Sequence, residues 1–238
     1  MNYPLSSKYS LEFLRENIMG PNPIKLLEEM FQRERPIEGS VVLDLGCGRG
    51  VTSIFMAKEY GLHVFATDLW VSATENKQRF DVMGLTIDQI IPIHAEAHEL
   101  PYADEFFDAV VSVDSYHYFG LEKDYLGQHL LPLVKHGGKL YLIVPGMKKD
   151  LHTALPPEML VTWSAEDLDT IHDSAHWRGV LEQTKGMEIE EIYELEGNDE
   201  CWRDWLACDN PYAVSDRKPM EAGAGKYMNM LAIILRRK

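Results

Sequence analysis

The stretch VVLDLGCGRG, residues 41–50, has the residue types of a ligand-binding turn. Gly46, Gly48 and Gly50 alternate directly behind a run of strand formers that contains one acid, Asp44. Glycine tolerates positive φ and carries no side chain, so this backbone can turn sharply and approach a large ligand. A dinucleotide fingerprint reads G-x-G-x-x-G, whereas the spacing here is G-x-G-x-G. The pattern therefore favours another kind of nucleoside over NAD.

A second acid follows the next strand-like run. Asp68 ends the segment HVFATD, where a carboxylate can accept hydrogen bonds from both hydroxyls of a ribose. Leu69 and Trp70 come directly after it and can pack on the face of a purine. These positions suit a nucleoside held beside the glycine turn.

The segment DSYHY follows a further strand-like run and supplies polar and titratable groups. Strand ends at one edge of an open parallel sheet border the ligand crevice. Asp114, Tyr116 and His117 are therefore candidates for contacts with a bound nucleoside cofactor and with a second substrate that accepts a group from it. If the acceptor is an amine, a carboxylate or imidazole that removes its proton would contribute. His117 can equally be a histidine packed between two tyrosines and merely hydrogen-bonded.

Strand-like runs alternate with segments of helical period, which predicts an α/β fold: a doubly wound, mostly parallel, seven-stranded Rossmann-like sheet. We expect a single domain with a helical N-terminal lid (1–35), a cofactor-binding core (41–144), a cap insertion (146–186) and a final strand pair with a Trp-rich connection (187–238). Strands are expected at 41–45, 63–68, 90–95, 108–114, 139–144, 187–196 and 226–237. Helices are expected within the lid and at 51–60, 72–84, 125–134 and 165–184, with a short, loop-rich link between the last two strands.

Four segments, in the right order and at the right spacing, resemble motifs of the class I S-adenosylmethionine-dependent methyltransferases, a Rossmann-like family. They are DLGCGRG, AEAHELPY, FDAVVSVDSYHYF and LPLVKHGGKLYLIV. The resemblance covers residues 41–144 and implies a small-molecule methyltransferase with S-adenosylmethionine as cofactor. It implies cofactor contacts from Asp44, Gly46, Cys47, Gly48, Gly50, Asp68, Leu69, Glu96, Ala97 and Asp114, with Glu96 and Ala97 at the adenine.

The segment after residue 145 is expected to make the acceptor pocket. In HDSAHW, His172 and His176 stand four residues apart, as in the zinc motif H-E-x-x-H, but Asp is shorter than Glu and no third ligand is evident, so we expect no metal. His176 and Trp177 are candidates for the acceptor, together with His117, although a core-packing face is the alternative. Other tryptophans of this half can provide aromatic walls for a cationic substrate or can simply hold the cap to the sheet.

Composition narrows the partners and the compartment. The net charge of -15 repels nucleic acid and anionic membranes, so neither is expected as a partner. No apolar run is long enough to span a bilayer and the N-terminus lacks a secretory core, which predicts a cytoplasmic protein. The alternatives are a nucleoside-binding regulatory protein without turnover and an NAD-dependent oxidoreductase. The sequence does not indicate an oligomeric state.

Overall fold

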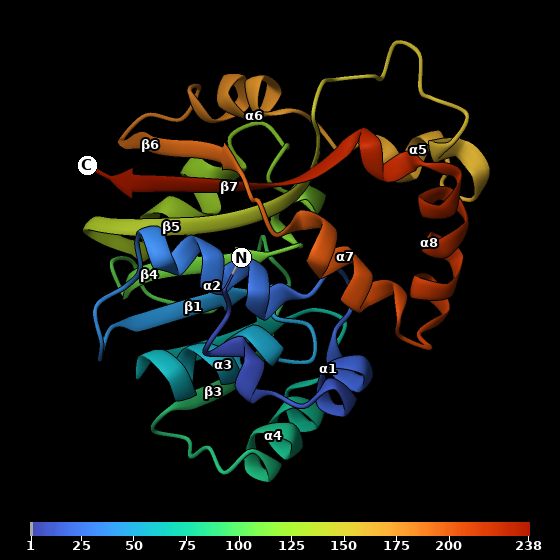
Figure 1. Cartoon of the computed structure of the whole chain (residues 1–238). Coiled ribbons are helices and arrows are strands. Elements are labelled where there is room, and N and C mark those ends of the chain that lie inside the picture. The colour runs from blue at the N-terminus through green and yellow to red at the C-terminus, as the bar shows by residue number, and fades with distance from the viewer. Residues whose placement is uncertain (1) are drawn as a thin grey trace.

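A seven-stranded sheet runs through the middle of the molecule (Figure 1). The computed structural model describes residues 2–238 and orders the strands β3-β2-β1-β4-β5-β7-β6. β7 is antiparallel to both its neighbours, and the other strands run in the opposite direction to it. Their bounds are β1 (Val41–Leu45), β2 (His63–Asp68), β3 (Ile90–His94), β4 (Phe107–Val113), β5 (Val134–Met147), β6 (Met187–Glu194) and β7 (Met228–Arg237). The predicted fold class is confirmed.

The helices of the cofactor-binding half begin at local capping signals. Asn22 caps α2 (Pro23–Arg33), and its side chain accepts a hydrogen bond from the Lys25 amide. Ser72 and Glu75 form a reciprocal capping box at the start of α4 (Ala73–Val82). α3 (Val51–Tyr60) has the predicted bounds, while α1 (Leu11–Asn17) begins the N-terminal segment. The expected helix at 125–134 is reduced to a π-helical turn, Leu126–Leu130, and a 3₁₀ turn, Leu131–Leu133, where Pro132 interrupts the α-helical pattern.

The expectation of one helix over 165–184 is wrong. The segment forms α5 (Ala165–Leu168) and α6 (Ser174–Leu181), each with its own N-cap. Between them, the backbone of His172 pairs with Gly146 in a parallel bridge, which requires extended rather than helical backbone. Asp173 then caps α6, because its side chain accepts a hydrogen bond from the His176 amide at 2.9 Å.

The link between β6 and β7 also differs from its expected short, loop-rich form. It contains α7 (Asn198–Leu206) and α8 (Pro211–Ala222). α8 has a sharp start, because Asn210 caps it and Pro211 occupies its first position. In Figure 1, α5, α7 and α8 gather at one end of the sheet, whereas α6 lies along β6.

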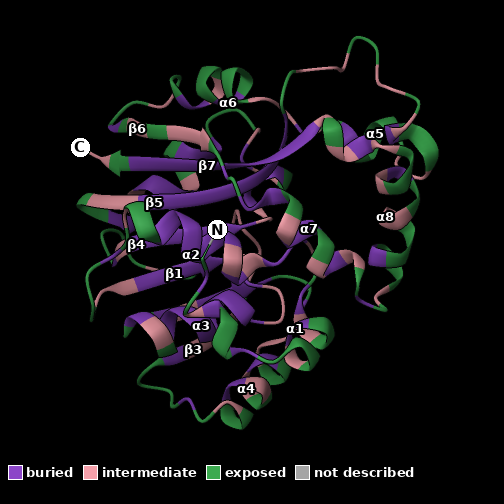
Figure 2. Cartoon of the chain, in the orientation of Figure 1, coloured by how far each residue is buried: buried purple, intermediate pink, exposed green. Residues whose placement is uncertain are grey.

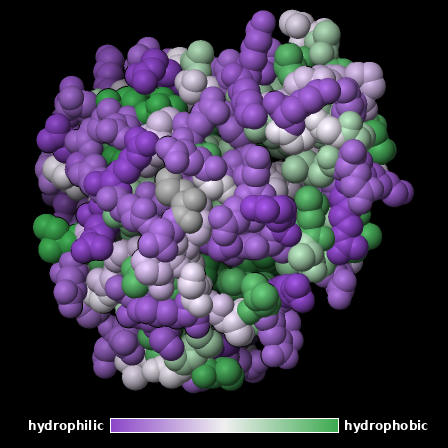
Figure 3. Space-filling model, in the orientation of Figure 1, coloured by the Kyte–Doolittle hydropathy of each residue, from purple (hydrophilic) through white to green (hydrophobic). Residues whose placement is uncertain are grey.

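Two apolar clusters cover the sheet, one on each face. The central strands β1, β4 and β7 are largely buried, whereas the edge strands β3 and β6 are mostly intermediate or exposed (Figure 2). One cluster joins α2, α3 and α7 to the sheet. The other contains Tyr116, Tyr125 and Trp177, so α6 is fastened to the sheet by the core. Hydrophilic side chains cover most of the face in Figure 3, with apolar atoms in separate smaller areas. None of the helices within residues 2–238 is both long and apolar enough to cross a membrane.

Candidate functional site

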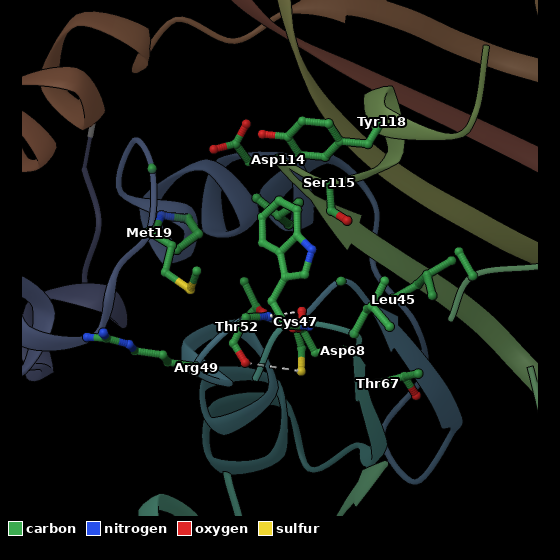
Figure 4. Close-up of a pocket in the computed structure, with 18 of the residues that line it drawn as sticks. Met19, Leu45, Cys47, Arg49, Thr52, Thr67, Asp68, Asp114, Ser115 and Tyr118 are labelled. Carbon is green, nitrogen blue, oxygen red and sulfur yellow. Dashed lines mark hydrogen bonds between the residues drawn. The ribbon is translucent and has the colours of Figure 1, made fainter. Parts of the chain in front are cut away.

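A cavity of about 380 Å³ lies at the carboxyl ends of β1, β2 and β4, where the sequence placed the ligand crevice (Figure 4). The linker between α1 and α2 forms its opposite wall. Of the predicted site residues, the lining contains Gly46, Cys47, Gly48, Asp68, Leu69, Glu96, Ala97 and Asp114. Sequence reasoning missed several others, including Met19, Gly20, Thr52, Ser115, Tyr118 and Glu122.

Neighbouring protein atoms leave no space for a side chain at Gly46 or Gly48. Both have positive φ, 74° and 53°. A Cβ on Gly46 would lie 1.8 Å from the Ser115 Oγ, and one on Gly48 would lie 2.9 Å from the Met19 Sδ. These close approaches bring the loop after β4 and the α1–α2 linker against the glycine turn. Gly50 does not line the cavity; a Cβ at this position would lie 2.5 Å from the ring of Phe80.

Asp44 lies beneath the loop, outside the cavity lining. Its Oδ2 accepts hydrogen bonds from the hydroxyls of Thr52 (2.6 Å) and Ser53 (2.5 Å) in the first turn of α3. The loop amides of Gly46 and Cys47 donate instead to the Thr67 carbonyl. Burial, partly offset by the two hydroxyls, raises the pKa of Asp44 to about 6. Asp44 therefore anchors α3 beneath the turn.

Asp68 holds the turn from the side of β2. Its Oδ2 accepts a hydrogen bond from the Gly48 amide at 2.7 Å, and its Oδ1 accepts from the amides of Trp70 and Val71, both at 2.8 Å. These bonds fix the direction of the carboxylate at the cavity wall. Two amides occupy the lone pairs of Oδ1, whereas Oδ2 has a second lone pair that a ligand hydroxyl can use.

An imidazole bridges two carboxylates at the far end of the cavity. His98 Nδ1 lies 2.8 Å from a Glu96 oxygen, and its Nε2 lies 2.9 Å from a Glu122 oxygen. The hydrogen bonds to Glu96 and Glu122 raise the pKa of His98. The His98 hydrogen bond is the main cause that lowers the pKa of Glu96. The network ties the segment after β3 to the loop that precedes the π-helical turn.

Asp114 also lines the cavity, and its backbone is in the left-handed region with φ 56°. The approach of its Oδ2 leaves no space for a side chain at position 20, where a Cβ would lie 2.0 Å from that oxygen. Desolvation, reinforced by the charge of Asp216, raises the pKa of Asp114 to about 7. Figure 4 shows the Asp114 carboxylate beside the phenol of Tyr118.

Further acids lie near that phenol. After burial, the charges of Asp114, Asp167 and Asp216 contribute to raising the pKa of Tyr118 to about 12. The Asp167 side chain accepts a hydrogen bond from the amide of Ser164, the N-cap of α5, and Asp216 accepts hydrogen bonds from the indole nitrogens of Trp163 and Trp205, both at 2.8 Å. Within residues 2–238, none of these three acids forms an ion pair with a basic side chain. The cation that would balance them is not supplied by the described chain.

Comparison with known proteins identifies this architecture. Residues 42–138 match the model of a family described as "Methyltransferase domain". This segment of the chain is therefore similar to a methyltransferase domain. Methyltransferase GfsG of Streptomyces halstedii is 25% identical over 175 residues, which make up 72% of this chain and 61% of GfsG. The chain spans less than two thirds of the length of the first curated relatives that it matches.

Solved structures share the fold of this methyltransferase domain. Geranyl diphosphate C-methyltransferase from Streptomyces coelicolor has a TM-score of 0.70 at 15% identity, with 91% of this chain and 79% of that chain covered. Phosphoethanolamine N-methyltransferase 2 from Haemonchus contortus has a TM-score of 0.71 at 17% identity, with 99% and 57% covered. The Haemonchus contortus structure is a complex with S-adenosylmethionine. The comparisons give no support to an oxidoreductase or to a binding protein without turnover.

The methyltransferase domain does not bring the two candidate catalytic residues to the cavity. Tyr116 and His117 lie in a 3₁₀ turn, Tyr116–Tyr118, and neither side chain lines the cavity. Tyr116 is fully buried and packs against Tyr125 and Trp177. His117 is buried, its Nδ1 has no hydrogen-bond partner, and burial lowers its pKa to about 3. Its neighbour Tyr118 is the residue of this turn that reaches the cavity.

The candidates from the cap do not line the cavity either. Trp177 is fully buried on the sheet, which is the core-packing alternative left open by the sequence. His176 is exposed on α6 and does not line the cavity. His172 precedes α6, so the two histidines do not share a helix face, although their rings stack at 3.5 Å between centroids.

Proposed function

We propose that this protein transfers the methyl group of S-adenosylmethionine to the nitrogen of a small basic molecule. One observation carries the choice of acceptor: three acids, Asp114, Asp167 and Asp216, lie near enough to the Tyr118 phenol for their charges to raise its pKa, and within residues 2–238 none of them forms an ion pair with a basic side chain. A protonated amine would provide the missing positive charge, and Tyr118 would add an aromatic face.

The residues around the cavity fit the cofactor. The glycine turn presents backbone without side chains, and the remaining lone pair of the fixed Asp68 carboxylate suits a ribose hydroxyl. Leu69 and Ala97 offer apolar contacts to the adenine, and Glu96 offers an acceptor for its amino group. When bound, S-adenosylmethionine supplies an activated methyl group, so the protein has to position the acceptor and exclude water.

We assign to Asp114 the proton-accepting role that the sequence offered to His117. An amine attacks as its free base, and a carboxyl group with a pKa near 7 can receive the proton at neutral pH. In the proposed reaction the proton moves from the ammonium to Asp114, the nitrogen forms a bond to the methyl carbon, and the carbon–sulfur bond breaks. The products are the methylated amine and S-adenosylhomocysteine.

The acidic surface supports small cationic acceptors over polyanions. A net charge of -15 attracts cations and repels phosphate backbones, so we do not propose nucleic acid as a partner. Cys47, Cys201 and Cys208 are free and buried, which agrees with work in the reducing cytoplasm.

The test is methyl transfer from labelled S-adenosylmethionine to a panel of primary and secondary amines, matched with neutral analogues in which a hydroxyl replaces the amine. We expect a labelled product from an amine only. Asp114→Asn should lower kcat/KM for that amine at least tenfold and change the Kd for S-adenosylhomocysteine less than threefold. Asp104→Asn, at an exposed acid, is the matched control.

Two outcomes would contradict the proposal in different ways. If Asp114→Asn lowers the affinity for S-adenosylhomocysteine as much as it lowers kcat/KM, Asp114 contacts the cofactor, as the family resemblance implies. It is then not the base that removes the proton of the acceptor amine. If neutral analogues are methylated as fast as amines, the basic acceptor is wrong.

A further inference from the structure

A group of side chains separate from the methyltransferase cavity has the composition of a transition-metal site. Asp150, His152 and His172 each offer a ligand atom, and these atoms lie within 4.8 Å of one another. None of the three lines the cavity described above. Two imidazole nitrogens and one carboxylate oxygen form the ligand set of many zinc sites.

The hydrogen bonds of His152 orient it as a metal ligand. Its Nε2 lies 2.9 Å from the Leu168 carbonyl, which can only accept, so Nε2 carries a proton. Its Nδ1 lies 2.7 Å from an Asp150 oxygen. In the neutral ring, that nitrogen and the carboxylate would face each other with lone pairs only, and either a second ring proton or a bound cation at this position removes the conflict. Metal-bound histidines commonly donate their other N–H to a backbone carbonyl in this way.

The third ligand comes from the other side of the cluster. His172 Nδ1 lies 3.3 Å from the second Asp150 oxygen, so one carboxylate stands between two imidazoles. A tetrahedral zinc ion with bonds of about 2.0–2.1 Å needs ligand atoms about 3.3 Å apart, which small side-chain rotations here would give. The ring of His176 stacks on His172, with 4° between the planes, and stands beside the cluster.

The backbone holds both halves of the cluster before any ion binds. The Met147 amide donates to the His172 carbonyl at 3.2 Å, which joins the segment before α6 to the end of β5. Asp173 Oδ2 accepts from the Asp150 amide at 3.1 Å while its Oδ1 caps α6. Ligands separated in sequence are thus positioned by main-chain bonds, so little ordering is required on binding.

We propose that Asp150, His152 and His172 bind a divalent transition ion of the zinc class. The ion links the loop after β5 to the segment that precedes α6, because each segment provides ligands, and water completes the coordination. The site is independent of the methyl-transfer chemistry, because its residues neither line the cavity nor belong to the glycine turn.

The test uses the untagged full-length protein after treatment with a chelator, titrated with ZnCl₂ by calorimetry. We expect one equivalent of zinc to bind, with proton release and a raised melting temperature. Cobalt, which has visible absorption bands when bound in a low-symmetry site, reports the coordination directly. His152→Ala and His172→Ala should each weaken zinc at least tenfold, whereas His63→Ala, an exposed histidine outside the cluster, should not.

Two results would overturn the proposal. One is the absence of stoichiometric binding at zinc concentrations up to about ten times that of the protein. The other is unchanged zinc affinity in the His152→Ala/His172→Ala double variant. Circular dichroism of each variant without metal establishes that it is folded, and His172→Cys, which keeps a zinc ligand, should retain binding if the variant is folded.

Discussion

The Gly46→Ala substitution tests how the glycine turn holds the cavity together. The added Cβ would lie 1.8 Å from the Ser115 Oγ and 2.4 Å from its Cβ, so the loop after β4 has to move. Overpacking of this kind costs about 1–3 kcal/mol. The φ of 74° adds about 1–2 kcal/mol of strain for a residue with a side chain. We expect the free energy of unfolding to fall by about 2–5 kcal/mol.

Gly84→Ala separates strain from collision. Gly84 has φ 72°, but a Cβ there meets nothing within 4 Å, so only the strain of about 1–2 kcal/mol applies. Urea unfolding of both variants, followed by tryptophan fluorescence, measures the difference, which we expect to be about 1–3 kcal/mol. Equal destabilisation of the two variants would refute the packing argument.

A double-mutant cycle locates the collision. The Ser115 Cα would be 3.9 Å from the new Cβ, an ordinary contact, so Ser115→Gly removes the obstacle while the strain remains. Gly46→Ala should therefore cost less in the Ser115→Gly background than in the wild type, by about the overpacking term of 1–3 kcal/mol. Additive effects would mean that the two residues do not meet.

Two further predictions concern the acid after β2 and the buried histidine. Asp68→Ala should weaken the binding of S-adenosylhomocysteine about 10- to 150-fold, the range for lost hydrogen bonds to a charged group. The control variant Asp88→Ala, at an exposed position, should leave the Kd unchanged. An unchanged Kd in Asp68→Ala would contradict the ribose assignment. Burial lowers the pKa of His117 from 6.5 to about 3. As the pH falls below 6.5, His117 is therefore protonated in the unfolded chain before it is protonated in the folded protein, and the free energy of unfolding decreases. His117→Phe removes this pH dependence, so the free energy of unfolding of the variant relative to wild type should rise by about 2 kcal/mol between pH 6.5 and pH 5. Urea unfolding that gives the same pH dependence for both proteins would contradict the prediction.

Features with local signals were predictable from the sequence. The bounds of α3, the Asn22 cap and the Ser72–Glu75 capping box depend on residues within a few positions of one another. The mostly parallel character of the sheet follows from the alternation of strands and helices. The positions of Asp68 and Asp114 at strand ends follow from the same rule.

The direction of side chains in the turn after β4 could not be read in this way. Asp114 adopts a left-handed φ and a 3₁₀ turn follows, so Tyr118, rather than Tyr116 or His117, reaches the cavity. No periodicity specifies which residue of such a turn faces the ligand. The glycine turn predicts that the lack of a side chain at Gly46 makes room for the ligand. In the structure, the nearest atom to a Cβ at this position belongs to Ser115, which is distant in the sequence.

The acidic and histidine clusters depend on tertiary contacts as well. Asp216 lies on α8, in a segment expected to be loop, and meets the cavity region only after α7 and α8 fold across the sheet end. His152 meets His172 because a bridge joins the end of β5 to the segment before α6. Sequence spacing drew attention to His172 and His176 instead, since both stand in one short string.

The most direct measurement is a crystal structure of the protein with S-adenosylhomocysteine. We predict that a ribose hydroxyl lies within hydrogen-bond distance of the Asp68 carboxylate, with the adenine beside Glu96 and Ala97 and the sulfur facing Asp114. A crevice closed by protein atoms, or the ligand bound at another place on the molecule, would contradict the account.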